Sequence, residues 1–320
     1  MKKSTLLTTF KVSALSLAIV GLTGCLGSGS SSSKSTVGSG SSTVSGAQVV
    51  SEVEWEDEID SARAENAGKN IDSINVFIHP DARLISEGSD VSFDSGYSKI
   101  ELIGGEDSGL LDLTTEIGGS TLKVRLVQQG ESLTFVSGDG KWEIELFEDD
   151  LEVDGRPFSF DYTVLGQWNY VETGDRSNDS NSDFTLAYFA SGVETTSEQL
   201  QALGDQTISY VGIYDGLVVR NGTPEGIFSE GTVGSADMTA NLGSGSVSLT
   251  LKDMQALSNQ TVTFNGQIIE ATNAFAGDRD AGTGSFSGRF FGPEANEAGG
   301  TWNLTDGDDK YIGAFGVEKN

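Results

Sequence analysis

The sequence contains little of the chemistry that most enzymes and metal sites use. It has one cysteine and one histidine in 320 residues. Zinc clusters, disulfide frameworks and nucleophile–histidine arrangements therefore lack most of the side chains that they need. No glycine-rich segment carries the Lys-Ser/Thr pair of a phosphate-binding loop. The sequence predicts a protein with no catalytic residues and no metal site.

Basic side chains and proline are also scarce. Lysine and arginine number 19 against 48 aspartates and glutamates, so the formal net charge is -29 at pH 7. A charge of this sign and size repels phosphate backbones, which makes nucleic acid a poor partner. Four prolines accompany 42 glycines. This balance favours tight turns and closely packed strands over collagen-like or proline-rich structure.

The amino-terminal residues predict an export signal. Three lysines lie within the first eleven residues, an apolar run follows over 12–22, and no acid precedes Glu52. The apolar run is about half of the roughly 20 residues that a membrane-spanning helix needs. It ends in Leu-Thr-Gly before Cys25, which resembles a bacterial lipobox. We expect residues 1–24 to be a lipoprotein signal peptide, with lipid attached to the Cys25 sulfur.

The segment after the cysteine predicts a tether. Residues 27–46 are almost entirely Ser, Gly and Thr, with Lys34 as the single charge. Such a segment behaves as a flexible coil that reaches about 25 Å. Leu26, in place of an aspartate, is typical of lipoproteins that are passed to the outer membrane. Residues 25–50 are therefore predicted to hold a folded body away from outer-membrane lipids.

Beyond residue 50, apolar side chains recur mainly at every second position, which predicts β-strands. Residues 142–146 alternate apolar and acidic, and residues 122–126 alternate apolar and basic. Each segment therefore has one face to bury. Gly-Gly, Gly-Asp and Asp-Gly pairs separate the candidate strands as turns. We expect a β handle domain over 51–175 with one short helix over 53–67.

A polar run over 174–183 predicts a boundary, after which the strands continue to the carboxyl end. Their close spacing predicts an eight-stranded antiparallel β-barrel over 184–320, with no open edge and a packed interior. The fold class is therefore all-β, a handle followed by a barrel. The expected barrel strands are 184–189, 207–214, 231–242, 246–251, 261–269, 282–291, 299–304 and 311–317.

The carboxyl-terminal residues resemble a known family. The run from Gly284 to Trp302, with its Phe-Phe-Gly-Pro turn and Gly-Gly-Thr-Trp end, and the Gly-Ala-Phe-Gly run over 313–316 look like the closing signature of transferrin-binding protein B and its relatives. In size the chain resembles the single-lobed members, such as factor H-binding protein. The resemblance implies surface exposure on the outer membrane and export by a dedicated outer-membrane translocator. Residues 202–205 depart from the pattern, because the family often has proline there.

Few side chains stand out as ligand-binding candidates. His79 precedes a proline at the end of an expected strand. Some relatives bind haem through a histidine, which makes His79 a candidate axial ligand; the alternative is an ordinary histidine in a surface turn. Trp168, Tyr170 and Tyr210 are candidate anchors of a protein interface, because aromatic anchors dominate binding energy. The sequence does not separate these three from core residues.

These observations predict a binding protein. We expect a surface-exposed lipoprotein that captures a protein partner without catalysis. The acidic charge favours a basic partner and an association that weakens with salt. Two alternatives stay open at this stage: capture of haem or another iron source through His79, and a structural role in the envelope.

Overall fold

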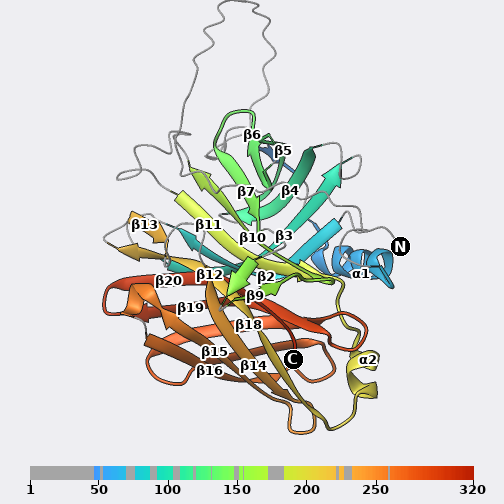
Figure 1. The fold of residues 1–320 in the computed structure, drawn as a ribbon. Helices are drawn as coiled ribbons and strands as arrows, with labels where there is room; N and C mark the ends of the chain where they lie inside the picture. The colour runs from blue at the N-terminus through green and yellow to red at the C-terminus, as the bar shows by residue number, and fades with distance from the viewer. Residues whose placement is uncertain are drawn as a thin grey trace, which may run out of the picture.

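The structure, a computed structural model, describes most of the chain beyond residue 46. The described residues are 47–50, 53–69, 76–86, 92–103, 109–117, 120–130, 132–147, 151–153, 155–171, 184–220, 223–226, 233–258 and 260–320. They form two antiparallel rings of strands, one above the other in Figure 1. The prediction of an all-β fold with an eight-stranded antiparallel barrel is confirmed. No helix among the described residues is long and apolar enough to cross a membrane.

The first ring is a sheet that curls until its two ends meet. Its strand order is β5-β4-β3-β2-β11-β10-β7-β6, and β6 pairs back onto β5. A two-residue strand, β1, adds to β5 beside this seam. The strands are β1 Gln48–Val49, β2 Val76–Ser86, β3 Ser92–Ile103, β4 Leu110–Ile117, β5 Ser120–Gln128, β6 Thr134–Ser137, β7 Trp142–Leu146, β10 Thr163–Val171 and β11 Phe184–Gly192.

The second ring is the barrel. Eight strands follow one another in space, and β12 pairs with β20 over ten residue pairs to close it. Strand β13 extends the end of β12 as a hairpin. The strands are β12 Thr207–Arg220, β13 Thr223–Gly226, β14 Gly234–Asn241, β15 Ser246–Met254, β16 Gln260–Ile268, β17 Ala274–Arg279, β18 Thr283–Phe291, β19 Glu297–Asp306 and β20 Asp309–Lys319.

The barrel interior is filled by aromatic and aliphatic side chains. Phe275 contacts the rings of Phe286 and Phe290 at centroid distances of 5.8 and 5.1 Å. Trp302 is fully buried and donates a hydrogen bond from Nε1 to the carbonyl of Ala314. Glycine at 313 leaves room for this indole, because a Cβ there would collide with the Trp302 ring and with the Asp215 carbonyl. The expected packed interior is therefore present.

The first ring has its own core, and helix α1, Trp55–Asn66, covers part of its outside. The Trp55 ring stacks on Tyr97 at 5.3 Å, and its Nε1 donates to Glu116. The helix predicted over 53–67 is confirmed. Ile59 and Ala62 are buried with Trp55, so one face of this otherwise charged helix is held against the sheet. Two shorter helices, α2 Ser197–Ala202 and η4 Gln255–Leu257, belong to connections.

The two rings pack through the outward faces of β10 and β11 on one side and β12 and β20 on the other. A small hairpin, β8 Leu151–Val153 and β9 Arg156–Phe158, covers the edge of this contact. Burial of apolar area at about 25 cal/mol per Å² is the main force that holds such a junction together. Its buried apolar residues are Phe158, Phe160, Leu165, Val171, Leu186, Tyr188, Ile213, Leu217, Val219, Ile312 and Ala314.

Two carboxylates lie within this largely apolar junction. Glu297 is 4% exposed, and its carboxylate accepts hydrogen bonds from the backbone N–H groups of Asp161 and Tyr162 at 2.7 and 3.1 Å. Burial raises its pKa to about 7. Asp215 lies on β12 between two junction residues, and burial together with the charge of Glu145 raises its pKa to about 7 as well. Both carboxyl groups thus keep their proton to a higher pH in the folded state than in the unfolded chain.

One strand assignment made from the sequence is wrong. Residues 184–189 were expected to begin the barrel, but β11 pairs with β10 and β2 in the first ring. The barrel begins at Thr207 and reaches eight strands through β17, Ala274–Arg279, which the alternation pattern did not reveal. A period of two identifies a strand, whereas the sheet that it joins depends on long-range pairing.

Candidate functional site

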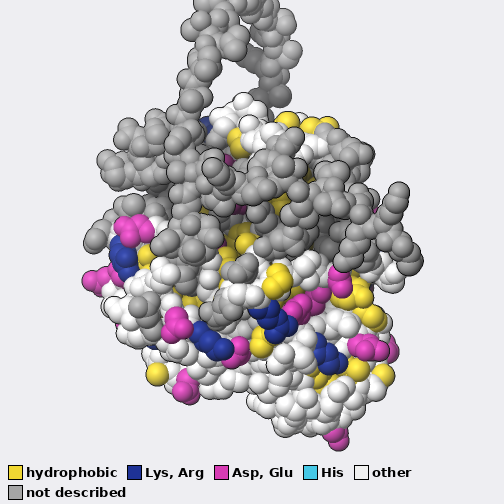
Figure 2. All heavy atoms as spheres, viewed as in Figure 1, with side chains coloured by type: hydrophobic (Ala, Val, Ile, Leu, Met, Phe, Trp, Pro, Cys, Tyr) yellow, Lys and Arg dark blue, Asp and Glu magenta, His cyan; other side chains and the backbone are white. Residues whose placement is uncertain are grey.

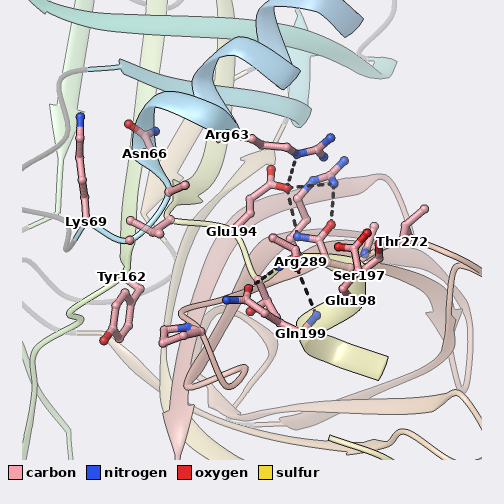
Figure 3. Close-up of a pocket in the computed structure, with 18 of the residues that line it drawn as sticks. Arg63, Asn66, Lys69, Tyr162, Glu194, Ser197, Glu198, Gln199, Thr272 and Arg289 are labelled. Carbon is pink, nitrogen blue, oxygen red and sulfur yellow. Dashed lines mark hydrogen bonds and ion pairs between the residues drawn. The ribbon is translucent and has the colours of Figure 1, made fainter. Parts of the chain in front are cut away.

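A large cavity among the described residues lies where the rings and their connection meet. It has a volume of about 920 Å³. Its walls are the carboxyl-terminal end of α1, the connection over 193–199, the turn over 269–274 between β16 and β17, and the side chain of Arg289 on β18. Parts of the chain more than two hundred residues apart therefore form one groove, shown in Figure 3.

Glu194 is the centre of a polar network in this groove. Its Oε2 accepts from Arg63 Nε at 2.8 Å and from Asn273 Nδ2 at 3.0 Å, and it lies 3.6 Å from Arg289 Nη1. Arg289 also donates to the Asn273 side-chain oxygen at 3.1 Å. The Glu194 side chain is only 13% exposed. The guanidinium groups of Arg63 and Arg289 compensate its negative charge. This network joins α1 of the first ring to two elements of the barrel.

The connection between the rings is held as a wall of the groove by backbone contacts. Residue 194 forms a β-bridge with Phe291, and the Thr195 N–H donates to the Phe290 carbonyl at 2.9 Å. Helix α2 begins at a capping box in which Thr196 and Gln199 bond each other's backbone. Hydrogen bonds from the backbone and from the Thr196 side chain lower the pKa of Glu198. The polar side of the groove is therefore rigid and charged.

The rim offers both apolar and cationic contacts. Ile269 is 49% exposed, which makes it one of the few large aliphatic side chains of the described residues left open to solvent. Ala271 in the same turn has a left-handed backbone with φ of 61°. Lys69 stands on the opposite side, about one third exposed. The groove is thus shaped to receive a protruding side chain or loop with an apolar tip, the kind of anchor that protein interfaces use.

Two of the residues predicted as surface anchors are core residues. Trp168 is fully buried in the first ring, where its Nε1 donates to Ser98 at 3.2 Å. Tyr210 is 1% exposed inside the barrel, and its hydroxyl donates to the Ala295 carbonyl. The prediction that they act as exposed anchors is wrong, because both side chains point into the interior of the ring to which their strand belongs. Tyr170 is partly buried, with its ring 4.9 Å from that of Trp142.

His79 lies within β2, opposite Ser98, and the pairing shifts by a bulge between His79 and Ala82. The expected proline turn is therefore a bulge in a continuous strand, because Pro80 cannot donate a backbone hydrogen bond to the neighbouring strand. The side chain of His79 and all of residue 25 lie outside the described part of the structure. Among the described residues, no group of three or more His, Cys, Asp or Glu could hold a metal ion.

No sequence motif indicated the groove. Its central residues, at 63, 194, 273 and 289, come from four separate parts of the chain, and none belongs to a motif. Two of these four residues are arginine, a higher share than in the whole chain. The four lie together only in the folded protein, so this share could not be noticed in the sequence. Figure 2 shows basic side chains beside acidic ones on the visible face of the barrel, so the acidic surplus does not form one continuous area there.

The matching family model is described as the C-lobe and N-lobe beta barrels of Tf-binding protein B, and it covers residues 166–319, just under half of the chain. This part of the chain is therefore similar to the barrels of the transferrin-binding protein B family, whose members are binding proteins without enzymatic activity. The resemblance noted in the sequence is therefore confirmed.

Three of the similar solved structures come from three different bacteria. Isotype 1 transferrin-binding protein B from serogroup B Neisseria meningitidis is 16% identical with a TM-score of 0.38, over 70% of this chain and 51% of that one. A double mutant of transferrin-binding protein B from Haemophilus parasuis is 12% identical with a TM-score of 0.39, over 79% and 76%. HpuA from Kingella denitrificans, solved with human haemoglobin, is 13% identical with a TM-score of 0.38, over 79% and 91%.

The chain thus spans about half of the meningococcal protein and most of the other two. Comparison with curated proteins gives no match.

Proposed function

We propose that this chain is a lipid-anchored protein of the outer membrane that is exposed at the cell surface and binds a protein partner without catalysis. The groove between the rings is its contact site. The observation that carries the proposal is that both rings and their connection build this groove, with an open aliphatic rim around a rigid charged floor. The similarity of residues 166–319 to this family and the surface location of the family support it.

The anchor rests on Cys25 and the preceding signal, and export to the surface requires a translocator in the outer membrane. The measurement is incorporation of labelled palmitate and fractionation of cells. Wild-type protein should carry the label and sediment with outer membranes, and Cys25→Ala should lose the label and appear in soluble fractions. Absence of label from wild-type protein would contradict the proposal. Protease treatment of intact cells distinguishes the two leaflets, since only surface-exposed protein is digested.

The partner class is tested with iron-carrying host proteins, because the similar structures include proteins named for transferrin and lactoferrin and one solved with haemoglobin. The purified chain is immobilised, and transferrin, lactoferrin and haemoglobin are each applied at low and at physiological salt. We expect one of them to bind, with an affinity that falls as salt rises, because the chain carries a net charge of -29. No binding by any of the three would remove this partner class.

The contact site is tested with a matched pair of substitutions. Ile269, at the rim, is 49% exposed, and Val127, on β5 of the first ring, is 47% exposed. Ile269→Asp should weaken binding at least about tenfold, because a buried charge replaces an apolar contact. Val127→Asp should leave binding unchanged. Equal effects of the two substitutions would place the contact elsewhere.

Haem capture through His79 is separated from protein binding by a spectroscopic titration. Haemin is added to the purified chain and the Soret band is recorded. If protein binding is the primary function, no shift dependent on His79 is seen. A tight shift that disappears in His79→Ala would replace the protein-binding proposal with haem capture. If neither haemin nor a protein binds, a structural role in the envelope takes its place.

A further inference from the structure

A second, separate groove lies on the outside of the barrel, over strands β14 to β17. Its volume is about 520 Å³. The cross-strand register aligns its side chains in two rows that run across all four strands. The first row is Thr239, Ser248, Asn265 and Asp278, and the second is Asn241, Ser246, Gln267 and Ala276. None of these residues lines the groove between the rings.

The rows are uniform in chemistry. Seven of the eight side chains carry a hydroxyl, an amide or a carboxylate, and Asp278 is the single charge.

Many polar atoms of these rows are open to a ligand. Within the described residues, the side chains of Thr239, Gln267 and Asp278 have no hydrogen-bond partner. Ser248 and Asn265 make only long contacts of 3.4 Å, to the Phe264 carbonyl and to Asp280. The Asn241 side-chain oxygen accepts from the Ser244 N–H at 2.9 Å, and the Ser246 hydroxyl lies 2.9 Å from that of Ser244. The donors and acceptors that the fold leaves over in these rows can bind a ligand rich in the same groups.

The lining excludes the other common ligand classes. No lysine, arginine or histidine lines the groove, so phosphate, sulfate and acidic lipid headgroups find no counter-charge. No aromatic side chain lines it, and the only aliphatic ones are Ala276 and the buried Val247. An apolar anchor from a protein partner therefore finds no complementary pocket.

The spacing fits a chain of hydroxyl groups. Neighbouring strands lie about 4.8 Å apart, and side chains on one face recur about every 6.7 Å along a strand. The two rows thus form a grid of donors and acceptors at separations comparable to those between hydroxyls on adjacent sugar rings. We propose that this face of the barrel binds a neutral oligosaccharide, with Asp278 accepting hydrogen bonds from a pair of hydroxyls.

The affinity follows from the same chemistry. Each hydrogen bond replaces one to water, so its net contribution is about 1 kcal/mol, and no ring is available for stacking. A single site should therefore bind with a dissociation constant on the order of 1 mM. Many copies on one surface would act together on a polymeric glycan.

The test uses the full purified chain and three neutral probes, maltohexaose, mannohexaose and N-acetylchitohexaose, at about 10 mM, with heparin as an anionic probe. Nuclear magnetic resonance follows the side-chain amide signals of Asn241, Asn265 and Gln267. The double variant Asn265→Leu and Gln267→Met keeps the side-chain sizes and removes both amides. Gln255→Met, on η4 of the same barrel and outside the groove, is the matched control.

We expect at least one neutral probe to shift these amide signals, the double variant to weaken binding about thirtyfold, and the control to match wild type. The expected loss corresponds to two neutral hydrogen bonds. The proposal is overturned if none of the neutral probes shifts the signals, if the shifts lie elsewhere on the protein, if the double variant binds as wild type does, or if heparin alone binds at this face.

Discussion

Glu297 provides a direct test of how the two rings are joined. Glu297 is 4% exposed at the junction, and its carboxyl group accepts a hydrogen bond from the backbone of the segment between β9 and β10. Because its pKa rises from 4.5 to about 7 on folding, the folded protein keeps a proton that the unfolded chain has lost between these values. The unfolded state therefore binds fewer protons, and the free energy of unfolding decreases as pH rises through this interval.

The size of the effect follows from the shift. A change of about 2.5 units at 1.36 kcal/mol per unit gives about 3 kcal/mol of stability that is present below pH 4.5 and lost by pH 8. Glu297→Gln keeps the shape and an acceptor oxygen but cannot ionise. The free energy of unfolding of this variant, from urea denaturation at several pH values, should lack that decrease. The difference between the two proteins should change by about 3 kcal/mol across the interval.

Glu294→Gln is the matched control, because Glu294 is exposed and lies three residues away, in the turn that precedes β19. Its pH profile should follow that of wild type. Parallel profiles for wild type and Glu297→Gln would refute the reasoning, as would a wild-type stability that increases with pH over the same interval.

Three further substitutions test other parts of the fold. Asp215→Asn should also flatten the decrease in stability between about pH 4 and pH 7, because the pKa of this carboxyl group is raised to about 7; an unchanged urea profile would contradict this. Trp302→Ala should cost about 3–5 kcal/mol by calorimetry, since the indole is fully buried in the barrel core. Arg156→Ala should lower the free energy of unfolding by less than about 1 kcal/mol, because its ion pair with Glu318 is exposed to solvent. A larger decrease in urea denaturation would mean that charge, and not apolar burial, stabilises the junction.

Local patterning was sufficient to predict the class of fold. Alternation in segments such as 246–251 and 142–146 reflects burial of one face, and the structure buries every second residue of β15 as far as Leu251. Strand β17 escaped because Ala274 and Phe275 are both buried, which breaks the alternation. Strand β11 was found but given to the wrong ring, because its partners β10 and β2 are chosen by contacts that no local pattern encodes.

The site could not be predicted in the same way. Aromatic residue type indicated Trp168 and Tyr210, but the direction of a side chain from its strand decided that both are core. The groove, in contrast, uses Arg63, Glu194 and Arg289, which are ordinary surface types in the sequence. Their role depends on the meeting of helix, connection and barrel, and so on tertiary structure alone.

The unequal seams of the two rings have a mechanical consequence. Strand β1 joins β5 by two residue pairs and β6 closes the first ring by three, whereas ten pairs close the barrel. A load applied through the amino-terminal end enters the fold at Gln48, beside the shortest seam. The first ring should therefore extend at low force while the barrel keeps its shape. Optical-trap pulling would record this as an early opening step, followed by a separate and stronger event.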